Sequence, residues 1–155
     1  MPTFTRARYL LGRLEFDHLR SLDEVSERQL LADSVQPVVD AGLVDWVASD
    51  HALTDEVRLE PTPGHTPGHV SVRIRSAGAE AVITGDLMHH PIQCCAPDVC
   101  SRFDADPEQA LATRMRFLRE QADRDVLVLG THFAEPTGGR IVADGAAWRF
   151  VVATS

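Results

Sequence analysis

The stretch Pro61–Val70, PTPGHTPGHV, places two histidines, His65 and His69, four residues apart, each directly after a Pro-Gly pair. Two further polar residues also follow apolar runs: Asp86 comes after AVITG, and His132 comes after DVLVLGT. Imidazole and carboxylate groups together make the ligand set that zinc and similar divalent metals prefer. Because strand ends feed loops that can direct side chains to one point, these residues are candidate ligands of a metal site.

Each of these residues also has an ordinary explanation when it is taken alone. A histidine after a strand is often a capping or surface residue, and a Gly-Asp pair after a strand often forms a turn. Their joint occurrence after three strand-like runs makes the metal interpretation an equal alternative to the ordinary one, because ligands that come from separate loops gather in this way.

The strands that would position these residues are visible as alternating or continuous apolar runs. They are expected over residues 56–63, 69–75, 81–84 and 125–129. The last part of the chain, residues 139–152, predicts a hairpin with Asp144-Gly145 as its turn. Asp106 and Pro107 predict the N-cap and the first residue of a helix.

The N-terminal part predicts one extended run followed by helices. Residues 8–16, RYLLGRLEF, are rich in apolar residues and β-formers and are expected to be extended. Ser21 and Glu24 form a capping-box pattern, which predicts that a helix begins near Ser21. Pro37 and Gly42 interrupt the helical pattern, so a second short helical turn or a loop is expected near Val38 to Asp40.

Helices and strands alternate along the chain, which is typical of a layered α/β (α+β) domain with helices on a sheet. No repeat and no linker is visible, so residues 1–155 predict a single unit. The long irregular stretch from Leu87 to Ala105 is expected to be a functional loop rather than a plain connector.

That stretch holds all three cysteines of the chain, Cys94, Cys95 and Cys100. An odd number in a compact cluster does not predict a disulfide framework. Reduced, partly buried thiols are the first interpretation. A zinc site or a redox pair is the alternative, although the spacing C-C-x-x-x-x-C matches no standard zinc module.

Composition limits the classes of partner. The net charge is −8, and all 15 basic residues are arginines. We expect no nucleic acid partner, because phosphate binding needs clustered positive charge, and the absence of lysine excludes a Schiff base and a P-loop lysine. No apolar run reaches the ~18 residues of a membrane helix. The N-terminus also lacks the uncharged core of a signal peptide, so no membrane contact and a cytoplasmic location are expected.

Three motifs in a fixed order resemble a known family. TPGHTPGHVSV, VITGDLMHH and LGTHF resemble the C-terminal half of the metallo-β-lactamase fold hydrolases, above all the lactonase-like and organophosphate-hydrolase-like members. The resemblance covers residues 8–152. It implies half of an αβ/βα sandwich and a site for two metal ions, usually zinc. It also implies water or hydroxide attack on an ester, lactone, amide or phosphoester of a small-molecule substrate.

The resemblance also implies a role for individual residues. His65 corresponds to a histidine of the first metal, and His132 to the last histidine of the second. Asp86 corresponds to the carboxylate that bridges both metals and orients the attacking hydroxide, which makes it the candidate catalytic residue. His69 is expected to support the loop instead of binding metal.

His89 and His90 lie where members of the family line the substrate cleft. For His90 an ordinary loop position is an equal alternative.

One departure from the family pattern is large. The leading motif H-x-H-x-D-H, which supplies four of the seven ligands that the resemblance implies, does not occur in the 155 residues. Each metal would keep one histidine and the shared Asp86, so zinc binding by this chain alone is expected to be weak. Without the other half of the sandwich, one sheet face is expected to be exposed. Self-association, or pairing with an N-terminal-half partner, is expected there.

Three hypotheses follow for the function. The chain is a truncated metal-dependent hydrolase, a non-catalytic half-fold that serves binding or assembly, or one half of a split enzyme that another chain completes.

Overall fold

The computed structural model describes residues 2–153. The chain divides between Ser49 and Asp50 into two compact units, and each is described here by itself. The prediction of one partial domain over residues 1–155 stays a prediction. Within residues 2–153, the longest helix is amphipathic, and no helix combines the length and the apolar character needed to cross a bilayer.

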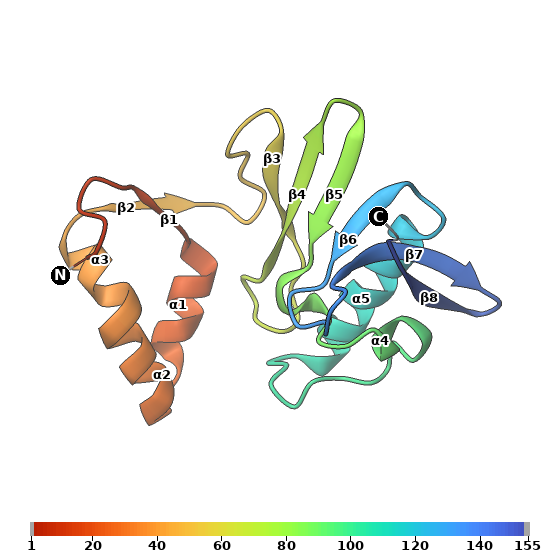
Figure 1. Cartoon of the computed structure of the whole chain (residues 1–155). Helices are drawn as coiled ribbons and strands as arrows, with labels where there is room; N and C mark the ends of the chain where they lie inside the picture. Colours follow the sequence, from red (N-terminus) through yellow and green to blue (C-terminus); the bar gives the residue numbers. More distant parts are fainter. Residues whose placement is uncertain (1, 154–155) are drawn as a thin grey trace. The chain divides into compact units, whose positions relative to one another are not determined.

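The first unit pairs two short parallel strands that helices connect (Figure 1). Its elements are β1 (Tyr9–Gly12), α1 (Arg13–Ser21), α2 (Val25–Leu30), the π-helical segment η1 (Leu31–Val35), α3 (Gln36–Asp40) and β2 (Val44–Val47). Phe16 of α1 is buried, and its ring centroid lies 4.7 Å from that of Trp46 in β2. This aromatic contact joins the helical layer to the two strands.

Two predictions for this unit are wrong. The extended run expected over residues 8–16 ends at Gly12, because β2 pairs with only four residues of β1 and the chain continues as a helix from Arg13. Ser21 ends α1 instead of starting a helix, and its hydroxyl donates to the carbonyl of His18 at 2.6 Å. Of the helical turn or loop expected near Val38 to Asp40, the structure has the helical turn, as part of α3, which begins one residue before Pro37.

The second unit is a six-stranded sheet in the order β3-β4-β5-β6-β7-β8. All neighbours are antiparallel except β5 and β6, which are parallel and joined by a long crossover. The strands are β3 (Val57–Pro61), β4 (Val70–Ser76), β5 (Ala79–Ile83), β6 (Val126–Leu129), β7 (Gly138–Asp144) and β8 (Ala147–Val152). The crossover holds the 3-10 turn η2 (Gly85–Leu87), α4 (Ile92–Cys95) and α5 (Pro107–Gln121). The layered α/β prediction is confirmed.

The predicted turns of this unit differ from the structure by little. The β7–β8 hairpin turns at Gly145 and Ala146, one residue later than expected, because Gly145 takes the positive φ of 64° that the turn needs. The helix α5 begins at Pro107 as predicted, and the Asp106 side chain accepts a hydrogen bond from the Gln109 amide at 2.9 Å.

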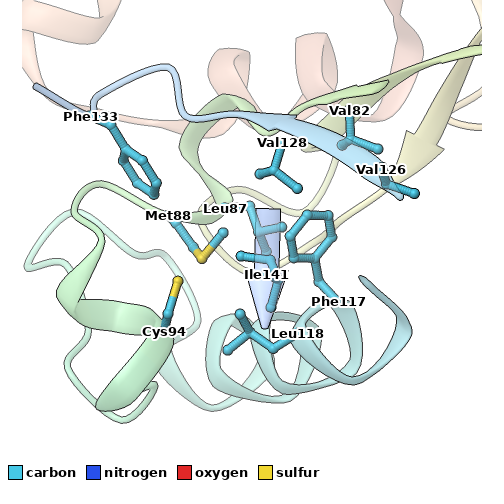
Figure 2. Packing of buried hydrophobic residues seen from close by; sticks show 10 residues of the cluster. All are labelled: Val82, Leu87, Met88, Cys94, Phe117, Leu118, Val126, Val128, Phe133 and Ile141. Carbon is cyan, nitrogen blue, oxygen red and sulfur yellow. The ribbon is translucent and has the colours of Figure 1, made fainter. Parts of the chain in front are cut away.

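The core of the second unit lies between one sheet face and α5, and Figure 2 shows its packing. It contains Val82, Leu87, Met88, Cys94, Phe117, Leu118, Val126, Val128, Phe133 and Ile141. Strands β5, β6 and β7, helix α5 and the crossover loop all contribute to it. The cluster therefore ties the loop that follows β5 to the sheet and the helix.

The opposite face of the same sheet is apolar but only half-buried. Its side chains are cross-strand neighbours: Val72 lies opposite Ile83, and Ile83 lies beside Leu129 in the parallel pair. Val72, Ile74, Ile83, Leu127 and Leu129 all keep intermediate exposure. The side chains that alternate with them, such as Val82 and Val128, are fully buried.

The three cysteines are free thiols, but the partly buried positions expected for them apply to one cysteine alone. Cys94 belongs to the core, and burial raises the pKa of its thiol to about 12. Cys95 and Cys100 are exposed. In the part of the chain that the structure describes, no cysteine joins a group that could hold a metal ion.

Candidate metal centre

The segments that carry the predicted ligands meet at one edge of the six-stranded sheet. Strand β3 ends where β4 begins, and the parallel strands β5 and β6 also end at this edge. His65 lies in the loop between β3 and β4, Asp86 lies in η2 after β5, and His132 lies after β6. Strand pairing thus brings together residues that are far apart in the sequence.

Two glycines let these segments approach closely. Gly64 has a φ of 138°, and a Cβ built there would lie 2.3 Å from the Cα of Ala110 in α5. Gly85 has a φ of 57°, and a Cβ there would lie 2.7 Å from Nε2 of His69. Only glycine fits these positions, so the Pro-Gly-His and Gly-Asp motifs have a steric reason as well as a chemical one.

Asp86 lies between two histidines. Its Oδ1 is 2.5 Å from Nε2 of His132, and its Oδ2 is 3.5 Å from Nε2 of His65. Partial burial of Asp86 opposes ionisation, but the hydrogen bond from His132 and the nearby imidazoles outweigh it and lower the pKa of Asp86. The group is therefore a carboxylate at neutral pH, with each oxygen facing a different imidazole.

His69 contacts the protein backbone through both ring nitrogens. Its Nε2 accepts the amide N–H of Asp86 at 2.8 Å, so the ring proton lies on Nδ1. Nδ1 is 3.0 Å from the carbonyl oxygen of Thr62 and 2.8 Å from the Thr62 hydroxyl. These contacts link the start of the loop to the backbone of Asp86, and they support the prediction that His69 has a structural role.

His89 joins the cluster more closely than expected for a residue of the substrate cleft. Its ring stacks on His132 with centroids 4.7 Å apart, and it lies 5.2 Å from the ring of His65. One potential ligand atom from each of Asp86, His89 and His132 lies within 4.8 Å of the others. Burial, followed by the nearby His132, lowers the pKa of His89 and favours the neutral imidazole that a metal needs.

His90, by contrast, lies at the start of α4. Its Nδ1 accepts the backbone N–H of Ile92 at 3.0 Å, and the residue is exposed. This contact supports the alternative of an ordinary loop position. A role for His90 in a substrate cleft stays a prediction.

Three buried side chains around the cluster were missed by the sequence analysis. Asp104 Oδ1 is 3.1 Å from Nδ1 of His65. Gln93 Oε1 accepts the backbone N–H groups of His89 and His90 at 2.6 and 3.2 Å. Arg114 is fully buried, and its place in the apolar stripe of α5 was the signal that a polar network lies beneath the helix.

Comparison with known proteins identifies the family of the chain. Residues 8–137 match the model of the metallo-beta-lactamase superfamily. The chain belongs to this superfamily. No curated protein sequence matches it.

Solved structures of the metallo-beta-lactamase fold align with most of the chain. AidC, a dizinc quorum-quenching lactonase, aligns with a TM-score of 0.80 at 20% identity over 94% of this chain and 54% of its own. The hydrolase AbOPH, in the beta-lactamase superfamily, aligns with a TM-score of 0.81 at 18% identity over 96% of this chain and 56% of its own.

A third relative was solved with a product at its metal centre. This N-acyl homoserine lactone hydrolase aligns with a TM-score of 0.64 at 21% identity, over 85% of this chain and 49% of its own. The chain spans about half the length of the solved structures that it matches.

The described residues fit part of a site for two metal ions. The two oxygens of Asp86 face Nε2 atoms of different histidines, as a carboxylate shared by two ions requires. His89 adds a neutral imidazole whose Nδ1 is buried without a hydrogen-bond partner in the described residues. Metallo-beta-lactamase ligands of the H-x-H-x-D-H type are missing from the 155 residues.

Proposed function

We propose that the chain carries one part of the active site of a metal-dependent hydrolase that acts on a small molecule with an ester, lactone, amide or phosphoester bond. The observation that carries the proposal is Asp86 between His65 and His132 at the edge of the sheet. These three residues would hold zinc ions, with His89 as a further ligand or a substrate contact. When bound, the ions supply Lewis-acid activation of water and of the scissile bond.

The residues of this chain prepare that chemistry in distinct ways. Asp86 is ionised at neutral pH because of its neighbours, so it can bind cations and orient the attacking water through a hydrogen bond. The buried Nδ1 of His89 needs a polar partner, and a metal ion or a substrate oxygen would satisfy it. His69 keeps the Asp86 backbone in place.

The remaining ligands would come from outside these 155 residues, either from another segment of a longer protein or from a partner chain. A homodimer cannot supply them, because each copy lacks the same motif. This reasoning covers the truncated-enzyme hypothesis and the split-enzyme hypothesis equally.

The test is complementation. The chain is purified alone and together with a polypeptide that carries the H-x-H-x-D-H half, and zinc content and hydrolysis of lactones, thioesters, β-lactams and phosphotriesters are measured. We expect weak zinc binding alone, and zinc retention with hydrolysis in the complex. Asp86→Ala should remove both. A complex that binds no zinc, or one that hydrolyses equally well with Asp86→Ala, would contradict the proposal.

A second candidate function is a non-catalytic assembly module, and the half-buried apolar sheet face favours it. Val72, Ile83 and Leu129 form a continuous row across three strands of that face. Rows of this kind are commonly covered by another molecule. Size-exclusion chromatography of the wild type and of Ile83→Glu tests this: an oligomer that the substitution dissociates supports the module, and a monomer in both cases contradicts it.

A further inference from the structure

Behind His65, on the side away from Asp86, lies a buried carboxylate. The side chain of Asp104 has no exposed surface, and both of its oxygens are engaged. Oδ1 is 3.1 Å from Nδ1 of His65, and Oδ2 accepts the backbone N–H of Ser101 at 3.0 Å. His65 therefore lies between two carboxylates, with Nδ1 toward Asp104 and Nε2 toward Asp86.

Asp104 has a charged neighbour that is also buried. Nη2 of Arg114 lies 3.8 Å from Oδ2 of Asp104 and has no hydrogen-bond partner in the described residues. The other nitrogens of Arg114 donate to the carbonyls of Leu87, Pro97 and Val99. One arginine thus holds the backbone directly after Asp86 and the loop that leads to Asp104.

The charges explain why this arrangement is stable. An isolated buried carboxylate is costly, and so is an isolated buried guanidinium. Asp104 and Arg114 compensate each other's charge at 3.8 Å, and both side chains have no exposed surface. Hydrogen bonds to three carbonyls and from the Ser101 amide satisfy the other polar atoms, apart from Nη2 of Arg114, which has the ion pair alone. Such a network has few alternative arrangements, so the position of the Asp104 oxygen near His65 is well defined.

We propose that Asp104 is a positioning residue of the metal site, held in place by Arg114. Its carboxylate accepts the Nδ1–H of His65, which fixes the neutral imidazole in one tautomer and leaves the lone pair of Nε2 directed toward Asp86. Both carboxylates beside His65 can only accept, but Asp104 Oδ1 lies 3.1 Å from Nδ1 and forms a hydrogen bond, whereas Asp86 Oδ2 lies 3.5 Å from Nε2. An imidazole carries its proton on the nitrogen that makes the hydrogen bond, which is Nδ1 here. This inference rests on the proposed function in one respect only: His65 is taken as a metal ligand.

The supporting role has a known chemical consequence. A carboxylate that accepts the second N–H of a ligating histidine fixes the ring and raises the basicity of the ligating nitrogen. His132 differs, because no hydrogen-bond partner of its Nδ1 occurs in residues 2–153. Of the two histidines that face Asp86, His65 therefore has its ring orientation and tautomer fixed by a carboxylate, and His132 does not.

The test begins with the metal-free chain. Long-range ¹H–¹⁵N correlation spectra above pH 7.5 report the tautomer of each neutral histidine, and the signals of His65 are assigned by their loss in His65→Gln. We expect the Nδ1–H tautomer for His65 in the wild type and a mixture or the opposite tautomer in Asp104→Asn and Asp104→Ala. Asp106→Ala is the matched control, because it removes the α5 cap two residues away without touching His65.

The second readout is zinc affinity of the same variants, measured by competition with a chelating dye in the complex with the H-x-H-x-D-H half. Asp104→Asn should weaken zinc binding by about 10- to 100-fold, whereas Asp106→Ala should leave it unchanged. Circular dichroism checks that Asp104→Asn is folded. If it is not, Asp104→Glu replaces it, and this variant should keep the tautomer but weaken zinc binding.

The outcomes separate this inference from the proposed function. A wild-type His65 with the proton on Nε2, or an Asp104→Asn variant with the tautomer and zinc affinity of the wild type, overturns the positioning role while the hydrolase proposal stands. A tautomer that shifts as expected supports the inference even where no zinc binds, and that absence of zinc counts against the hydrolase proposal alone.

Discussion

His65 and His132 face the two oxygens of one carboxylate, yet their surroundings differ. The side chain of His65 is 17% exposed, and that of His132 is 48% exposed. The ring of His65 is backed by Asp104, whose partner Arg114 is buried under α5. His132 lies in a loop after β6, where its ring stacks on His89.

The difference indicates that the chain prepares one half of the centre and leaves the other half open. On the His65 side, the ring is held by Asp104, whose side chain is buried with that of Arg114. On the His132 side, the contacts are the hydrogen bond with Asp86 and the stacking on His89. The open side is where ligands from outside these residues would complete the site.

The largest expected effect is on stability. Arg114→Met keeps most of the side-chain volume but leaves Asp104 as an unpaired buried charge and removes the donors to three carbonyls. Breaking a buried ion pair costs about 3–5 kcal/mol, so the free energy of unfolding in urea should fall by that amount. No equivalent substitution exists on the His132 side of the centre, because no buried cation supports His132 in the described residues.

Arg116→Met is the matched control for this prediction. Arg116 lies on the same helix, but it is exposed and donates only to the carbonyl of Pro61 at 3.0 Å. The control should change the free energy of unfolding by less than about 1 kcal/mol. Equal effects of the two substitutions would show that Arg114 is not a special support of the His65 side.

Zinc binding should show the second-largest effect. In the completed protein, His65→Ala should weaken zinc binding by more than the roughly 100-fold upper range for losing a supporting hydrogen bond. His132→Ala should weaken zinc binding less, because the side chain of His132 is more exposed than that of His65 and must be held still when it binds. His69→Ala should have the smallest effect of the three, about tenfold, since it acts through the backbone of Asp86.

Isothermal titration with zinc in the complemented complex gives this ranking. Circular dichroism of each variant separates a lost ligand from a lost fold. If His132→Ala lowers the zinc affinity more than His65→Ala does, the exposed His132 side contributes more of the binding free energy than the buried His65 side.

Thiol reactivity should report the same contrast with a smaller effect. At pH 8 the exposed Cys95 and Cys100 should react with a disulfide reagent within minutes, whereas Cys94 should not, because burial raises its pKa to about 12. Arg114→Met loosens the loop that packs Cys94 into the core and should make the third thiol reactive. His132→Ala should leave Cys94 unreactive. The absorbance of the thiolate released from the reagent gives the number of thiols that react in each variant.

Much of the second unit could be predicted from the sequence because its signals are local. Alternating apolar residues mark β3 and β4, a short apolar run marks β5, and the Asp-Pro pair marks the start of α5. The juxtaposition of His65, Asp86 and His132 follows from strand ends that share one edge. Their roles as ligands stay predictions.

Other parts depend on contacts that no local pattern contains. Asp104 acts on a histidine 39 residues away, and Arg114 acts on a carbonyl 27 residues away. In the first unit, residues 8–16 suit a strand and a helix about equally. The four-residue length of the pairing with β2 decides where the strand ends.

The smallest expected effect tests the open side of the centre directly. His132→Ala in the metal-free chain should change the free energy of unfolding by no more than about 0.5 kcal/mol, because the side chain is half-exposed and its hydrogen bond with Asp86 competes with water. His65→Ala should cost about 1–3 kcal/mol, since it leaves the buried Asp104 oxygen unsatisfied. Urea unfolding of the two variants side by side measures the difference. Equal costs would show that burial of Asp104 does not make the His65 side more rigid, and the asymmetry between the two halves would then rest on exposure alone.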